Sequence, residues 1–157
     1  AGPPPVTPAT PPEVDAVLDG SCGDVIFDVG GDDAGATVLG RLADRIRTMD
    51  YEMIYVINRF RTLTSEPEQA VGLLREIETA SHLRASALVN NSHLKDQTSP
   101  EDILGALEFA HSTARLLDLP LRCTTAPASI AEALRDKVEN LYPVSIYVRS
   151  PWEMENK

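Results

Sequence analysis

The sequence predicts an α/β fold with an open, mostly parallel sheet and helices on both of its faces. Short apolar runs rich in β-branched and aromatic residues alternate with segments whose apolar residues recur at helical spacing. Such alternation is typical of parallel strands joined by crossover helices. The chain has 157 residues and 43% of them are apolar, so we expect one sizeable core.

Five strands are expected, at residues 24–29, 53–57, 85–89, 119–124 and 144–148. A short helix is expected at 13–18, and apolar residues from Leu39 to Met49 recur at the spacing of a second helix. Ser65-Glu66-Pro67-Glu68 predicts the capping-box start of a third helix. A fourth helix begins at Ser99-Pro100-Glu101 and carries its apolar face to Leu117, and residues 129–132 cap a short fifth.

Composition divides the chain into three parts. Residues 1–12 contain six of the twelve prolines, which remove backbone donors and fix φ, so we interpret them as a tail or linker. Residues 13–150 form the expected domain, and residues 151–157, which include Trp152, form a C-terminal tail.

Charge and hydropathy narrow the functional classes. The net charge of −10 argues against a duplex-binding surface, which needs clustered Lys and Arg. The sequence contains no run of 18 apolar residues and no basic, apolar leader, so we expect neither a membrane span nor a secretion signal. The two cysteines, Cys22 and Cys123, form no CxxC pair, which is typical of the reducing cytoplasm.

The richest candidate site follows the first expected strand. Asp28 ends that strand, and Gly30, Gly31 and Asp32 lie where the chain turns into a helix. Glycine lets backbone amides approach an anion, and a strand-end Asp can hold Mg²⁺ through water. Asp28-Val-Gly-Gly31 matches a D-x-x-G element of nucleotide hydrolases. The alternative is a glycine-rich turn whose aspartates cap the helix.

Polar residues also follow the next three expected strands. Asn58-Arg59-Phe60-Arg61 predicts either a phosphate or carboxylate contact or surface ion pairs. Asn90 has an amide suited to a purine edge, or it forms an Asx turn. Thr124 to Pro127 either lines a base pocket or turns the chain.

The order of these strand ends resembles the MinD/ParA-type P-loop ATPases, also called the CobQ/CobB/MinD/ParA nucleotide-binding domain, over residues 24–130. The resemblance covers Asp24 to Gly31, Leu88-Val-Asn90 and Leu121 to Pro127. It implies a three-layer, P-loop NTPase-like fold in which Asp28 orients Mg²⁺ and the attacking water. It further implies that Gly31 meets the γ-phosphate, that Asn90 meets adenine, and that Pro127 lies in the base-side loop.

The family's K-G-G-x-G-K-[ST] loop is not present before Asp24, so the resemblance is to the C-terminal half of the domain. We therefore expect either a fragment of a longer ATP-binding protein or a protein that has lost this loop. Mg-ATP binding, hydrolysis and nucleotide-dependent dimerisation or partner switching are expected in the full-length form, and not tight binding or hydrolysis by this chain alone.

Two other functions stay open. One is a non-enzymatic interaction module that associates with itself or with a protein partner through an exposed sheet edge. The other is a small-molecule enzyme with Asp32, Asp33 and His93 as acid–base groups.

Overall fold

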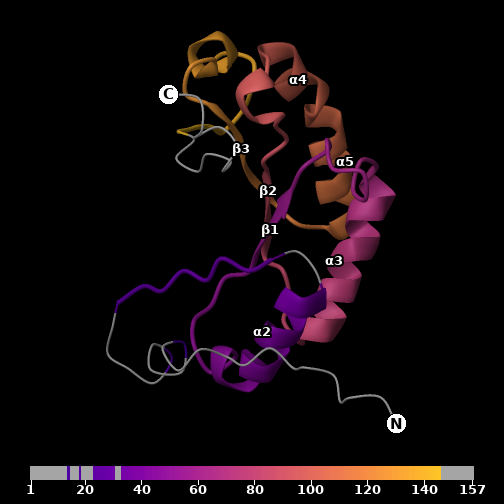
Figure 1. The fold of residues 1–157 in the computed structure, drawn as a ribbon, viewed down its shortest axis with the longest axis vertical. Helices are drawn as coiled ribbons and strands as arrows, with labels where there is room; N and C mark the ends of the chain where they lie inside the picture. Colours follow the sequence, from indigo (N-terminus) through magenta and orange to yellow (C-terminus); the bar gives the residue numbers. More distant parts are fainter. Residues whose placement is uncertain (1–13, 15–17, 19–22, 31–32, 146–157) are drawn as a thin grey trace, which may run out of the picture. The chain divides into compact units, whose positions relative to one another are not determined.

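The computed structural model describes residues 14, 18, 23–30 and 33–145 and contains a four-stranded, all-parallel sheet (Figure 1). The strands lie in the order β1 (Ile54–Ile57), β2 (Ala87–Asn90), β3 (Leu121–Pro127) and β4 (Leu141–Val144). The described residues divide into two compact units. The sheet unit holds residues 54–73 and 85–145. The other unit holds the described residues up to Met53 together with 74–84.

The helices confirm most of the expected pattern. They are α2 (Asp33–Ile46), α3 (Pro67–Ser81), α4 (Pro100–Gly105) and α5 (Leu107–Leu117), with short 3₁₀ turns η1 (Lys95–Gln97) and η2 (Ala131–Leu134). The single helix expected from residue 100 to Leu117 is broken at Ala106, whose backbone lies at φ −91° and ψ −6°. The expected helix at 13–18 is described at Val14 and Leu18, which are both helical.

Helix starts follow the expected capping logic with one change of partner. Ser99 and Asp102 form a complete capping box around Pro100 at the start of α4. At the start of α3, the side chain that accepts from the Glu66 N–H is that of Gln69, at 3.1 Å, rather than that of Glu68. Because α3 begins at Pro67, Gln69 rather than Glu68 is the third helical residue, from which a side chain reaches back to the residue before the helix.

The prediction of a strand at 24–29 is wrong. These residues form no strand, and their side chains are exposed, with Ile26 at 93%. A β-branched run predicts a strand only where a neighbouring backbone can accept its hydrogen bonds, and the described residues pair β1 with β2 alone. The last strand occupies 141–144 rather than 144–148, and positions 146–148 lie outside the described residues, as do 1–12 and the expected tail with Trp152.

In the sheet unit, the helices pack on one face of the sheet (Figure 1). Right-handed crossovers keep their helices on the same face when the strand order never reverses, as in β1-β2-β3-β4. Tyr55 on this face donates to the Ala70 carbonyl of α3 at 3.0 Å. Ala126 on the same face packs with Ile103 of α4 and Leu134 of η2.

The opposite face of the sheet carries exposed apolar side chains. Register and alternation place Ile54 and Val56 of β1 on this face together with Tyr142 of β4. Their exposed fractions are 45%, 55% and 62%. Within the sheet unit, the described strands are therefore covered on one side, whereas a doubly wound sheet was expected to be covered on both.

The other unit is built around the crossing of α2 with the end of α3. Leu42, Ala43 and Ile46 of α2 pack with Leu83 and Leu18. Gly40 permits the approach, because a Cβ at this position would lie 2.4 Å from the Ala80 carbonyl oxygen.

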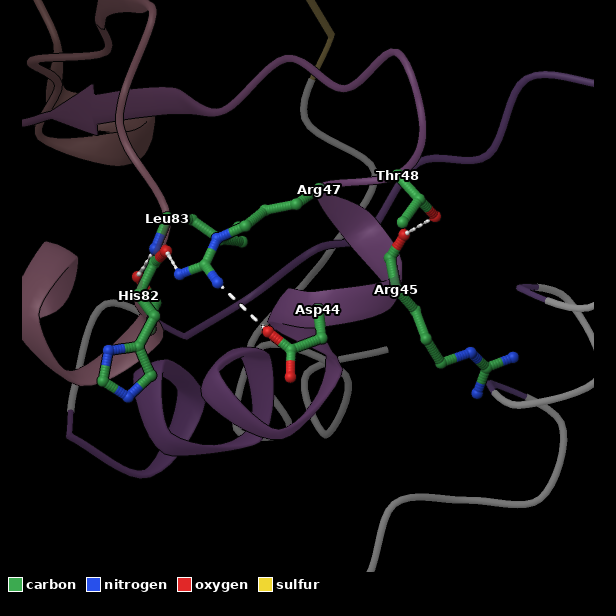
Figure 2. A network of polar contacts seen from close by, with 7 residues as sticks. Asp44, Arg45, Arg47, Thr48, His82 and Leu83 are labelled. Carbon is green, nitrogen blue, oxygen red and sulfur yellow. Dashed lines mark hydrogen bonds and ion pairs between the residues drawn. The ribbon is translucent and has the colours of Figure 1, made fainter.

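A polar bridge closes the same crossing (Figure 2). The Arg47 guanidinium donates to the Asp44 carboxylate at 3.1 Å and to the His82 carbonyl, which joins the end of α2 to the residue after α3. Arg45 points away from this bridge (Figure 2). His82 has a positive φ of 57°, so α3 ends there in a left-handed residue without glycine.

Across the described part of the chain, none of the helices combines the length and the apolar character needed to cross a bilayer.

Candidate functional site

The carboxyl ends of β1, β2 and β3 gather three polar loops at one edge of the sheet. The loop after β1 is tied to the loop after β2, because the Asn91 N–H donates to the Ile57 carbonyl at 2.8 Å and the Arg59 N–H donates to Ser92 Oγ at 3.0 Å. Ligands of parallel α/β sheets bind beyond this edge. We call the loops 58–64 and 91–95, together with residues 124–128 at the carboxyl end of β3, the carboxyl rim.

Asn90 holds the rim together from inside. Its side chain is fully buried, donates to Thr124 Oγ1 at 3.4 Å, and accepts from Ser92 N and Ser92 Oγ at 3.2 and 2.6 Å. The bond from the Ser92 N–H is an Asx turn, which was the alternative to the adenine-reading role. Because both ends of the amide are engaged within the fold, Asn90 presents no group to a base in this conformation.

Thr125 joins the end of β3 to the loop after β2. Its hydroxyl lies 2.5 Å from Asn91 Oδ1 and 3.4 Å from the Asn90 carbonyl oxygen, and it is buried. Pro127 ends β3 as a half-buried residue in register with Val144. The structure thus brings Asn90 and Pro127 to one edge, as expected. Ser92 and Thr125 were not predicted as members of this network, although hydroxyl residues directly after a strand are a signal for one.

The two arginines of the loop after β1 have different environments. Arg59 directs its guanidinium to the Gly105 carbonyl at the end of α4, so it braces the loop. Arg61 is exposed, and its side chain makes no ion pair with any residue that the structure describes. The surface ion pairs that formed the alternative interpretation of these arginines are therefore not seen for Arg61.

His93 lies half-buried between basic residues. Its Nδ1 accepts the Lys95 N–H at 3.0 Å, which fixes the ring and assigns the proton of the neutral form to Nε2. Burial lowers the pKa of His93 below its ordinary 6.5, and the charges of Arg61 and Lys95 lower it further. The rim therefore concentrates positive charge on a chain whose net charge is −10.

Two of the predicted catalytic and phosphate-facing residues, Asp28 and Gly30, are described, and they belong to the other unit. Asp28 and Gly30 lie in the exposed, irregular segment 23–30, and Gly31 and Asp32 lie outside the described residues. The Gly30 carbonyl oxygen packs against Gly35, where an added Cβ would come within 2.3 Å of it. The glycine spacing thus serves a close backbone approach at the start of α2.

A magnesium site needs several oxygen ligands. Asp28 is exposed, and no group of three or more His, Cys, Asp or Glu side chains among the described residues is arranged to hold a metal ion. Asp28 as described is therefore a single exposed carboxylate, and the Mg²⁺ contact expected of it in the full-length form stays a prediction.

An open hollow of about 740 Å³ lies at the other end of β3, lined by residues that include Glu108, Arg115, Asp118 and Pro120. It borders the start of β3, whereas the carboxyl rim follows its end. The Arg115–Glu108 ion pair in its wall, at 3.0 Å, is exposed on both sides. An exposed ion pair of this kind is typical of a solvated surface. We therefore place the candidate site at the rim, where buried polar side chains converge.

Comparisons of the chain with protein-family models, with curated proteins and with solved structures give no match.

Proposed function

We propose that this chain is the C-terminal portion of a cytoplasmic MinD/ParA-like ATP-binding protein. In this proposal the carboxyl rim supplies the base-side half of a nucleotide site, and sequence outside this chain supplies the phosphate loop. The supporting observation is the all-parallel order of β1, β2 and β3, which gathers the loops after all three strands at one edge. This is the edge at which parallel α/β sheets bind their ligands.

The proposal accounts for the irregular segment 23–30. Its apolar side chains are exposed, although their sequence is typical of a buried strand. In the full-length form, Asp28 would orient the metal and Gly31 would meet the terminal phosphate, as the family resemblance implies. A nucleotide that orders this segment would couple binding to dimerisation or partner switching.

A titration of this chain with Mg-ATP tests the proposal. At millimolar nucleotide, we expect NMR amide shifts at residues 91–95 and at Thr125, Ala126 and Ala128, with a dissociation constant near 1 mM, about −4 kcal/mol. No turnover of ATP is expected. Adenosine should shift the amides of Thr125, Ala126 and Ala128 as well, because the base contacts do not need phosphate. If neither ligand shifts any amide of the rim, the proposal is wrong.

A second function is supported by a different observation. The exposed apolar residues Ile54 and Val56 lie on β1, which pairs with β2 along one edge among the described strands. An apolar strand without charge or proline invites pairing with another chain. An interaction module without nucleotide binding therefore remains the alternative, and it predicts association that ATP does not change.

A further inference from the structure

We propose that Arg61, Lys95 and His93 form a phosphate-binding lobe of the carboxyl rim. This inference rests on the proposed function and deepens it by assigning one contact with the ligand's anionic group to residues of the rim, beside the phosphate loop that lies outside this chain. The ligand class is a phosphate ester or polyphosphate with an attached aromatic or apolar group.

The first support is a preorganised loop after β1. Arg61 N donates to the Asn58 carbonyl at 3.3 Å, and Thr64 N donates to the Arg61 carbonyl at 3.1 Å. Thr64 Oγ1 also donates to the Asn58 carbonyl at 3.2 Å, and Asn58 Oδ1 accepts the Phe60 N–H at 2.9 Å. Because these bonds fix the backbone on both sides of Arg61, little backbone entropy is lost when its side chain grips a ligand.

The second support is the junction with the loop after β2. The Arg59–Ser92 bond joins the two loops, and the Lys95–His93 bond shapes the second loop so that Lys95 takes a positive φ of 54°. Like charges gathered in this way repel one another, and a bound anion relieves that repulsion. Arg61 is the exposed cation of the lobe without an ion-pair partner in the described chain.

The third support is the apolar surface on the same two loops. Phe60 and Leu63 on the first loop and Leu94 on the second are exposed at 37%, 82% and 41%. Apolar side chains beside a phosphate on Arg61 suit a phosphate ester that carries an apolar group. Asp96 follows Lys95 on η1 and is the acidic residue nearest to it in sequence, so it offsets part of the positive charge of the lobe.

Inorganic pyrophosphate tests the lobe without a base. Followed by NMR, it should shift the His93 ring signals and raise the pKa of His93, because a nearby anion favours the imidazolium form. Arg61→Ala should weaken pyrophosphate binding about tenfold, and Arg61→Lys should restore part of it, since Lys keeps the charge but loses the forked geometry.

Matched controls separate binding from general charge effects. Arg135→Ala removes an exposed arginine that is paired with Glu132 on η2, and it should leave pyrophosphate binding unchanged. Sodium chloride at equal ionic strength should raise the His93 pKa less than pyrophosphate does, because it only screens the charges of Arg61 and Lys95. Equal effects of chloride and pyrophosphate, or unchanged binding in Arg61→Ala, would overturn the lobe. Adenosine shifts at 125–128 without pyrophosphate shifts at His93 would overturn the lobe and leave the proposed function standing.

Discussion

At the scale of single residues, Asn90 decides how the carboxyl rim is built. Its amide reaches Ser92 and Thr124, which stand on the same strand end and on the neighbouring strand. A buried side chain that makes three hydrogen bonds is costly to remove, because its partners are left buried without hydrogen bonds. The residue that was expected to read a base therefore serves first as the internal tie of the rim.

Asn90→Ala should lower the free energy of unfolding by about 2 kcal/mol, since Ser92 and Thr124 lose a buried partner. Urea denaturation measures the change. The exposed Gln97→Ala is the control, and its effect should stay within about 0.5 kcal/mol. Equal stability of the two variants would show that the Asn90 contacts are not energetically coupled to folding.

Tyr55 gives the sheet unit a distinct response to alkaline pH. Burial raises the pKa of its hydroxyl from 10.0 to about 12, while the hydroxyl donates to the Ala70 carbonyl. The folded state thus holds this proton more tightly than the unfolded state. Its stabilising contribution is complete below pH 10.0 and is lost as the pH rises towards about 12.

Tyr55→Phe should therefore remove the part of the alkaline destabilisation that comes from this group. It should also cost about 1 kcal/mol at neutral pH through the lost hydrogen bond. Urea unfolding from neutral pH to pH 11 compares the two proteins. An identical pH dependence of both proteins would contradict the assigned role of Tyr55.

At the scale of elements, the crossing of α2 and α3 depends on one glycine. A Cβ on Gly40 would collide with the Ala80 carbonyl, whereas a Cβ on Gly72 of α3 meets nothing within 4 Å. Gly40→Ala should destabilise the protein by about 1–3 kcal/mol through overpacking. Gly72→Ala should stabilise it by up to about 1 kcal/mol through helix propensity.

Thermal unfolding of the two variants provides the measurement. Both changes introduce the same methyl group at a helical glycine, so they differ in the space around it. Opposite shifts of the melting temperature are expected. A melting temperature of Gly40→Ala at or above the wild-type value would mean that the two helices do not approach as closely as described.

The cap of α4 links a sequence signal to acid stability. Hydrogen bonds from the Ser99 backbone and side chain lower the pKa of the half-buried Asp102 below its ordinary 3.8. Stability from this group is present above pH 3.8 and is lost as the pH falls through the lowered pKa. Ser99→Ala should lower the free energy of unfolding by about 1 kcal/mol at neutral pH and reduce its loss below pH 3.8. Urea unfolding at neutral pH and below pH 3.8 measures both effects.

The sequence predicted best those elements whose signals are local. The Ser99 cap, the stripe of α2 and the apolar cores of β1, β2 and β3 depend on residues within one turn or one strand, and all are present. The strand at 24–29 failed because pairing depends on a distant backbone that the run itself does not encode. The break at Ala106 was not predicted, because an alanine carries no helix-stop signal.

For the candidate site, the sequence predicted which strand ends meet but not which side chains bond to each other. The parallel topology placed Asn90 and Pro127 at one edge, as the alternation of elements indicated. The inward engagement of Asn90 depends on Thr124 of another strand, and the proximity of Arg61 to His93 depends on two loops that meet in space. Spacing along the chain carries neither piece of information.

At the scale of the whole molecule, the exposed apolar surface of β1 bears on partner binding. Ile54 and Val56 face solvent on an all-apolar strand at the end of the described sheet order. Natural edge strands usually carry a charge, a proline or a bulge that blocks association. The absence of such a residue from β1 fits both a missing strand in the proposed full-length protein and a surface for a second chain.

Val56→Lys tests whether the exposed surface of β1 binds another strand or chain at all. A charge at the centre of β1 should weaken self-association or binding of an added strand at least tenfold, with the circular dichroism spectrum unchanged. Sedimentation velocity over a concentration series measures the association. Leu116→Lys is the matched control, because Leu116 is also exposed, at 51%, but lies on α5. A wild-type chain that stays monomeric at the highest concentration would rule out self-association through β1 and leave the edge to a strand from outside this chain.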